Sequence, residues 1–210
     1  MATKTTQRIG IWIIAGALVF GTIGSFAVMI LAPKNQQADQ ARAQEQYAQY
    51  QESLDAYQEQ VTAQATELSE KYYDEFSQYE SVPAAFDKAD VTKLETKDLK
   101  IGSGEVIAKD SEYSAYYIGW NPQGEVFDSS FDGESLKAPI AGGNLIEGWN
   151  EGVVGMKTGG VRLLTIPAEQ AYGEQGQGDN IPPNTPLKFI VMIIPKVEEI
   201  PVPDLSGLGQ

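Results

Sequence analysis

The chemistry open to this chain is limited by two residue types that it lacks. Its 210 residues include no His and no Cys, which excludes disulfides, thiolate catalysis, Cys-based zinc sites and triads with a histidine base. Any reaction must therefore use carboxylates, Tyr, Lys, Ser or Thr side chains, backbone groups or a shaped apolar pocket. Fifteen Lys and Arg against 29 Asp and Glu leave a net charge of −14, so we expect no nucleic-acid partner.

One loop near the C-terminal end is a candidate for a functional segment. Residues 171–189 read AYGEQGQGDNIPPNTPLKF and contain three glycines and three prolines. Gly and Pro set special backbone dihedrals, and loops of this length are uncommon unless they serve a function. The loop leads into the apolar run LKFIVMII at 187–194, which predicts a strand.

The elements that position this loop are predicted to form an α+β domain over residues 91–197. Short β-like runs are separated by Gly-containing turns, and one helical stretch intervenes at 144–156, which is typical of an antiparallel sheet with a short helix packed on it. The tail at 198–210 has turn formers and little to bury, so we expect it to be flexible. The predicted strands are 91–101, 112–120, 125–130, 161–167 and 187–197.

Five motifs occur in order between Leu99 and Val197. They are Y-x-G, G-x-x-F-D-S-S, I-x-G-W-x-E-G, A-Y-G and I-P-P-N-T-x-L-x-F. Together they resemble the FKBP-type peptidyl-prolyl cis/trans isomerase family. The resemblance implies a twisted antiparallel sheet of about five strands wrapped over a short helix, with the ligand pocket between helix and sheet. It also implies an isomerase of X-Pro bonds that needs no cofactor or metal, with a pocket that could take macrolide inhibitors.

The resemblance also implies a role for each matching residue. Trp149 would form the pocket floor under the proline ring, and the backbone N–H of Ile146 and the hydroxyl of Tyr172 would donate to substrate carbonyls. Asp128 would accept hydrogen bonds at the rim and interact with Tyr117, without acting as a general base. The walls of the pocket would be Tyr117, Phe127, Leu145, Ile146 and Phe189.

Several positions of the pocket and its loop depart from the family pattern. Ile181 matches the pattern and would close the far side of the pocket, whereas Leu136 stands where the family usually has an aromatic pocket residue. Gln177 and Asn180 lie in the overhanging loop where apolar or aromatic residues often help catalysis. Asn121 replaces a common apolar residue after Y-x-G. These departures imply a wetter pocket and a modest activity.

The N-terminal region is predicted to hold a membrane anchor. Residues 9–32 carry no charge, and 24 helical residues span about 36 Å, enough for a bilayer core of about 30 Å. The run is longer than the apolar part of a cleaved signal peptide, which is the alternative. Lys4 and Arg8 place the N-terminus, residues 1–8, in the cytoplasm by the positive-inside tendency. The expected location is thus the cell membrane, single-pass, with the C-terminal domain outside the cytoplasm.

Residues 35–80 are predicted to form a helical stalk. They contain no Pro or Gly, and apolar residues recur at spacings of three and four from Tyr47 to Tyr79. A coiled coil that makes a homodimer and a lone helix resting on the next domain or on the membrane both fit this pattern.

The function expected from these features is that of a membrane-anchored prolyl isomerase that helps translocated or surface proteins to fold. Two alternatives stay open at this point. One is a non-catalytic FKBP-like chaperone or scaffold at the membrane, and the other is an oligomeric membrane protein in which the stalk is the functional part.

Overall fold

The computed structural model describes residues 36–143 and 145–203, and the chain divides into two compact units. One unit holds the chain up to Tyr57 together with the segment from Pro201 onward, and the other is Gln58–Ile200. The second unit is wider than the range 91–197 expected from the sequence. The expected anchor at 9–32 lies outside the described residues. No helix within the described ranges is both long and apolar enough to cross a bilayer.

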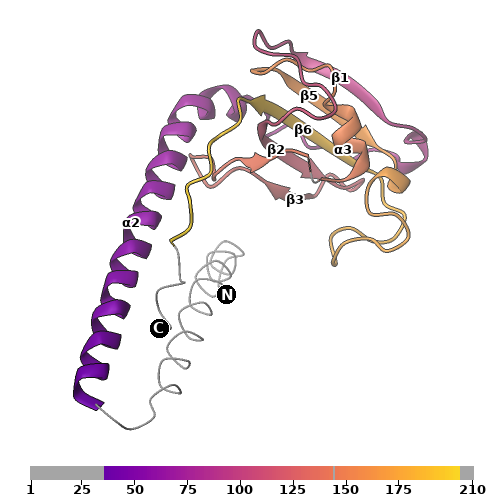
Figure 1. Cartoon of the computed structure of the whole chain (residues 1–210). Coiled ribbons are helices and arrows are strands. Elements are labelled where there is room, and N and C mark those ends of the chain that lie inside the picture. Colours follow the sequence, from indigo (N-terminus) through magenta and orange to yellow (C-terminus); the bar gives the residue numbers. More distant parts are fainter. Residues whose placement is uncertain (1–35, 144, 204–210) are drawn as a thin grey trace. The chain divides into compact units, whose positions relative to one another are not determined.

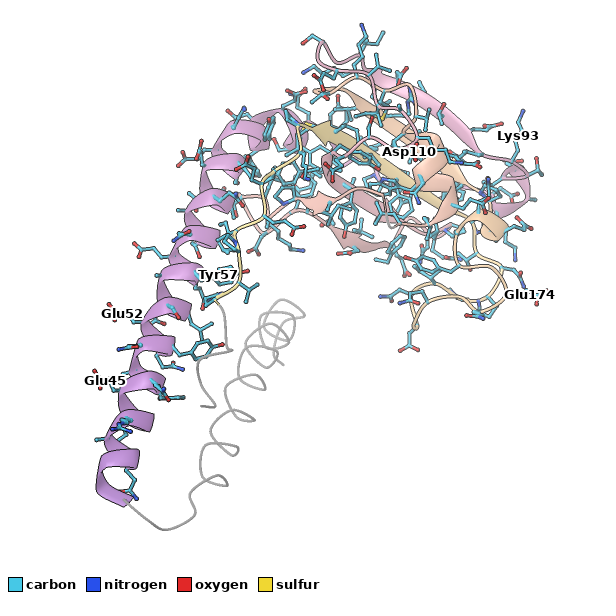
Figure 2. The ribbon with its side chains drawn as sticks, viewed as in Figure 1. Glu45, Glu52, Tyr57, Lys93, Asp110 and Glu174 are labelled. Atoms are coloured by element: carbon cyan, nitrogen blue, oxygen red, sulfur yellow. The ribbon has the colours of Figure 1, made fainter. Side chains whose placement is uncertain are left out.

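A single helix, α2, runs from Gln36 to Phe76 and is followed by a short 3-10 turn at Ser77–Tyr79. Its sequence is rich in Ala, Gln and Glu, which have high helix propensity. In the first unit, Glu45 and Glu52 extend from one side of the helix and Tyr57 from another (Figure 2). Glu45 and Glu52 therefore share a face of the helix that Tyr57 does not.

The second unit contains one antiparallel sheet with strand order β1-β5-β6-β2-β3, and the two-residue strand β4 pairs with β2. This confirms the predicted antiparallel sheet of about five strands with a short helix. The helix, α3, is Glu147–Gly152 and is shorter than the stretch expected at 144–156. The strands are β1 Glu95–Lys100, β2 Ser114–Trp120, β3 Val126–Ser129, β4 Ile140–Ala141, β5 Val161–Ile166 and β6 Leu187–Ile194.

Both faces of the sheet are covered, and this explains why β6 is apolar at almost every position. Phe189, Val191 and Ile193 belong to one buried cluster, whereas Ile190 and Met192 belong to another. Alternate residues of a strand point to opposite faces, so each cluster occupies one face. Figure 1 shows α3 lying against the sheet, and the α3 residue Trp149 belongs to the first cluster. We call the cluster that contains Trp149, Phe189, Val191 and Ile193 the site cluster. We call the cluster that contains Phe76, Ile190 and Met192 the α2 cluster.

The end of α2 covers the second face. Phe76 is completely buried and stacks on Phe131, with ring centroids 5.2 Å apart and planes inclined by 11°. The following segment also packs on the sheet, because the Trp120 indole N–H donates to the carbonyl of Ala84 at 3.1 Å. The last part of the predicted stalk is thus built into the same compact unit as the sheet.

A buried arginine on the sheet binds the C-terminal end of α3. Arg162 of β5 is 9% exposed, and its Nη1 donates to the carbonyls of Gly152 and Val154 at 2.8 and 3.1 Å. Its Nε donates to Oδ1 of Asp98 on β1 at 2.6 Å. The guanidinium therefore satisfies carbonyls that the end of a helix leaves unpaired.

Candidate functional site

Four aromatic side chains from four different elements meet on the face of the sheet that α3 covers. The ring of Trp149 lies edge-to-face with Tyr117 and with Phe189, at centroid distances of 5.6 and 5.2 Å. Phe127 lies edge-to-face with Phe189 at 5.5 Å. Edge-to-face pairs at these distances are favourable beyond the apolar area that they bury. Tyr117 and Phe127 are only partly buried, so this group of rings reaches the surface.

The glycine of Y-x-G lets two of these rings approach each other. Gly119 lies on β2 opposite Phe189 of β6. A Cβ atom at Gly119 would lie 2.6 Å from Cε1 of Phe189 and 2.7 Å from Cζ of Phe127. Since real Cβ atoms do not approach other heavy atoms so closely, any side chain at this position would push the rings apart. The motif glycine is therefore a packing requirement of the aromatic group.

Trp149 is held in place by a tyrosine that the motifs did not indicate. The indole is 2% exposed, and its Nε1–H donates to the hydroxyl of Tyr113 at 3.2 Å. Tyr113 is itself buried in the site cluster, and burial raises the pKa of its hydroxyl. The hydroxyl therefore stays neutral and orients the indole. No sequence signal marks Tyr113 beyond its place at the edge of a predicted strand.

Asp128 is fixed on two sides by the residues around it. The hydroxyl of Tyr117 donates to Oδ2 of Asp128, and the backbone N–H of Ser129 donates to Oδ1 at 2.8 Å. Ser130 binds the backbone of Tyr117 twice, because its Oγ accepts the N–H of Tyr117 at 2.9 Å and its own N–H donates to the carbonyl at 2.8 Å. Asp128 and Ser130 thus hold this segment to Tyr117, and Ser129 fixes the carboxylate of Asp128.

The start of α3 leaves the backbone N–H of Ile146, the residue before the helix, available to a ligand. The carbonyl of Ile146 accepts the N–H groups of Trp149 and Asn150 at 3.0 and 3.1 Å. The side chain of Asn150 donates to the carbonyl of Leu145 at 2.8 Å and so holds this turn. The N–H of Ile146 makes no hydrogen bond to another described residue, and the Leu145 and Ile146 side chains pack against the site cluster. A carbonyl of a bound peptide could accept from this N–H.

Tyr172 enters the site from the base of the long loop. It is partly buried and packs against the site cluster. Burial raises the pKa of its hydroxyl, and the charge of Asp128 raises it further. The hydroxyl is therefore a hydrogen-bond donor near Asp128 over the ordinary pH range.

The loop that follows Tyr172 folds back on itself. The N–H of Gln177 donates to the carbonyl of Ile181 at 2.7 Å, and Ile181 is buried in the site cluster. Gly176 has a φ of 65°, and a Cβ atom there would lie 2.3 Å from the carbonyl oxygen of Ile181. Only glycine fits this position. Glu174, on the same loop, is exposed (Figure 2).

The side chain of Asn121 holds the backbone around it through hydrogen bonds, whereas the sequence suggested only that it makes the pocket wetter. The side chain is 3% exposed, and its Oδ1 accepts the N–H groups of Gln123 and Glu125 at 3.0 and 3.1 Å. Its Nδ2 donates to the carbonyl of Asn180 at 3.3 Å. Asn121 therefore shapes the turn between β2 and β3 and ties it to the long loop. It does not make the pocket wetter, because its polar atoms are satisfied internally.

The structure corrects the role expected for Leu136. This side chain is 4% exposed and lies in the α2 cluster, with Phe76 and Phe131, on the opposite face of the sheet from Trp149. The other predicted residues are brought together in or against the site cluster, and Asp128 is joined to them through Tyr117. They are Tyr117, Phe127, Leu145, Ile146, Trp149, Tyr172, Ile181 and Phe189.

Comparison with known proteins gives a consistent result. Residues 103–194 match the family described as FKBP-type peptidyl-prolyl cis-trans isomerase. Over 99 residues the chain is 43% identical to an FK506-binding protein of Neisseria meningitidis serogroup A, covering 47% of this chain and 91% of the relative. Over 103 residues it is 43% identical to a probable FK506-binding protein of Corynebacterium glutamicum, covering 48% and 85%. The crystal structure of AtFKBP13 is 37% identical, covers 50% of this chain and 93% of that one, and has a TM-score of 0.43.

Proposed function

Since this chain belongs to the FKBP-type peptidyl-prolyl cis-trans isomerase family, we propose that the aromatic group around Trp149 is where it isomerises X-Pro bonds. The observation that carries this assignment is the convergence of four rings from four elements, with Ile146 packed against their cluster and its N–H bonded to none of the described residues. Apolar walls with one or two fixed donors are the usual composition of a site for a small apolar group.

The reaction needs no nucleophile, because no bond is broken. Rotation about the X-Pro bond has a barrier of about 18–20 kcal/mol, since amide resonance is lost as the bond turns. The catalyst must therefore bind the twisted amide more tightly than either planar form. An apolar site favours the twisted form, because the planar amide is more polar and loses more of its hydration on entering the site.

In the proposed complex the proline ring lies on Trp149, between Tyr117 and Phe189. The N–H of Ile146 and the hydroxyl of Tyr172 donate to carbonyl groups of the peptide and hold them while the bond turns. Asp128 keeps the Tyr117 ring in place through the hydroxyl. No proton is transferred, so none of these groups has to change its charge during a turnover.

Two tryptophans offer a matched test of this site. Trp149 and Trp120 are 2% and 3% exposed, and each indole donates one hydrogen bond, but they lie on opposite faces of the sheet. Trp149→Phe should lower kcat/KM for a peptide with an apolar residue before Pro about tenfold, or about 1.4 kcal/mol. Trp120→Phe should lower the rate much less, because Trp120 lies on the face of the sheet away from the rings around Trp149. Equal losses in the two folded variants would contradict the assignment.

We also propose that residues 9–32 anchor the chain in the cell membrane, with the isomerase unit outside the cytoplasm. The support is the charge-free run with Lys4 and Arg8 before it. Protease added to intact expressing cells should then degrade the second unit. Full protection until lysis would reverse the orientation, and a mature N-terminus beyond residue 32 would indicate a cleaved signal. In this location the substrates would be translocated or surface proteins.

The names of the relatives suggest a ligand for the same site. The Neisseria protein is named for binding FK506, and we propose that a macrolide of this type binds against Trp149 and inhibits the isomerase. A titration that follows the isomerase rate tests this. We also propose that residues 35–80 associate with a second copy of the chain. Analytical ultracentrifugation of the full chain in detergent tests this.

A further inference from the structure

The last turns of α2 make a buried hydrogen bond to the segment that follows β3. The Oγ atom of Ser69 accepts the backbone N–H of Leu136 at 2.8 Å, and the two residues are 6% and 4% exposed. A buried backbone N–H is costly to leave unpaired, so this hydroxyl has a definite structural effect. A helix outside the family-matched range of residues 103–194 therefore supplies a partner for the backbone inside it.

A second contact from α2 holds Phe131, at the start of the turn that ends at Leu136. Phe76 of α2 stacks on Phe131, and Phe131 forms a β-bridge with Leu136. Between these two residues, the N–H of Asp132 donates to the carbonyl of Ser135 at 2.9 Å and closes the turn. Ser69 and Phe76 thus hold the two ends of one tight turn, residues 131–136.

Besides these two contacts, the Leu136 side chain of the turn is buried in the α2 cluster. Elsewhere, the helix and the turn line a groove, with Ala65 and Glu70 on the helix side and Asp132 and Glu134 on the other. The helix and the turn are therefore not packed against each other along their whole length. The Ser69 hydrogen bond, the Phe76 stack and the buried Leu136 side chain together fix where the turn lies.

From this turn, a chain of hydrogen bonds reaches the site. The N–H of Lys137 donates to the carbonyl of Ser130 at 2.8 Å, and the ammonium group of Lys137 donates to the carbonyl of Ser129 at 2.7 Å. Ser130 in turn binds both backbone groups of Tyr117, and Asp128 is bonded to the Tyr117 hydroxyl. A shift of residues 131–137 is therefore transmitted to residues 128–130.

We propose that Ser69 and Phe76, on the last turns of α2, act on the isomerase site from a distance, and that Ser69 is a positioning residue for Asp128 and Tyr117. The inference rests on the proposed site at Trp149. Small misplacements of groups around a reacting amide lower the rate strongly. The helix that the sequence presents as a stalk thus sets the position of the β3 segment, through Leu136 and Phe131.

The test uses the full chain and one matched pair of variants. Ser69→Ala removes the acceptor for the Leu136 N–H, whereas Thr66→Ala removes an exposed hydroxyl that bonds only within α2, to the carbonyl of Thr62. We expect kcat/KM to fall roughly three- to tenfold in Ser69→Ala. It should be unchanged in Thr66→Ala and largely restored in Ser69→Thr, which keeps a hydroxyl.

A second readout separates positioning from a loss of stability. The backbone amide NMR signals of Ser129 and Ser130 should shift in Ser69→Ala and stay in place in Thr66→Ala, at a temperature where both variants are folded. If Ser69→Ala does not fold, Phe131→Leu serves instead, since it keeps an apolar contact but loses the stack on Phe76. The expected result is again a reduced kcat/KM with shifted Ser129 and Ser130 signals.

Full activity with unshifted Ser129 and Ser130 signals, in folded Ser69→Ala or in folded Phe131→Leu, would overturn the proposal. Equal losses in Ser69→Ala and Thr66→Ala would overturn it as well. Failure of the underlying site assignment would look different, because Trp149→Phe would then be no worse than Trp120→Phe. The two failures are therefore distinguishable in the same assay.

Discussion

The hydroxyl of Tyr117 on β2 donates to Oδ2 of Asp128 on the neighbouring strand β3. The other carboxylate oxygen, Oδ1, accepts the N–H of Ser129 at 2.8 Å. Both oxygens of Asp128 are thus engaged by groups of the chain itself. This arrangement suits a fixed acceptor that orients a ring, and a general base would need a lone pair directed at the substrate.

The first prediction follows from that arrangement. Asp128→Asn keeps an oxygen that can accept from the Tyr117 hydroxyl, so the ring should stay in place. A neutral hydrogen bond is worth about 0.5–1.5 kcal/mol, and kcat/KM should therefore fall only several-fold. Tyr117→Phe, which removes the donor from the same pair, should have a similar effect. Complete loss of activity in folded Asp128→Asn would instead indicate proton-transfer chemistry.

The second prediction concerns Tyr172 and its dependence on pH. Burial and then the charge of Asp128 raise the pKa of this hydroxyl above its ordinary value of about 10, so it remains protonated and a donor at pH 9. The kcat/KM of the chain should therefore be flat from pH 7 to pH 9, and Tyr172→Phe should be several-fold slower throughout. An unchanged rate in Tyr172→Phe, or a fall centred below pH 9, would contradict a donor role.

The grouping of most candidate residues in one cluster could be predicted from the sequence, because many of them lie in a local motif with a fixed place on a strand or helix. Tyr117 and Gly119 lie two apart and therefore on one face of β2, and Phe189 lies on the same face from β6. Leu136 lies in a tight turn, where no strand or helix period tells which face an apolar side chain will join. Its assignment to the pocket was wrong for that reason.

The packing of α2 on the sheet could not be predicted from the sequence either. Spacing of Tyr72, Phe76 and Tyr79 identifies an apolar face of the helix, and it does not identify what covers that face. In the structure Phe76 is buried against Phe131 and Tyr116, which are far away in the sequence. The hydrogen bond between Ser69 and Leu136 could not be predicted either, because the sequence around a helical serine does not indicate which distant residue it will contact. Contacts between residues so far apart in the sequence can be identified only once the fold is known.

The third prediction concerns a buried hydroxyl in the α2 cluster. Tyr116 is completely buried, and its hydroxyl has no hydrogen-bond partner among the described residues. An unpaired buried polar group costs about 1–3 kcal/mol, so Tyr116→Phe should raise the free energy of unfolding at pH 7 by about 1 kcal/mol. Urea denaturation measures this, with Tyr79→Phe as a control from the periphery of the same cluster. A clear destabilisation would mean that the hydroxyl has a partner.

The same variant should change how stability depends on alkaline pH. Burial, with a smaller contribution from Tyr72, raises the pKa of Tyr116 well above its ordinary value of about 10. Above pH 10 the unfolded chain therefore loses this proton while the folded chain keeps it, and the free energy of unfolding falls as pH rises. The fall between pH 9 and pH 11 should be shallower in Tyr116→Phe. Equal slopes in the two proteins would contradict this origin.

The last prediction concerns Arg162, whose guanidinium bonds two carbonyls at the end of α3 and the carboxylate of Asp98. Arg162→Lys keeps the charge, but a single ammonium group cannot reproduce the planar set of three bonds, so carbonyls are left unpaired in a buried place. We expect the free energy of unfolding to fall by about 1.5–3 kcal/mol in urea denaturation. Lys93→Ala is the control, because its ion pair with Glu95 is exposed and worth less than about 1 kcal/mol. The kcat/KM of folded Arg162→Lys should stay near normal, since Trp149 and Ile146 lie in and before the first turn of α3. Normal stability with a strongly reduced rate would show instead that Arg162 governs the site.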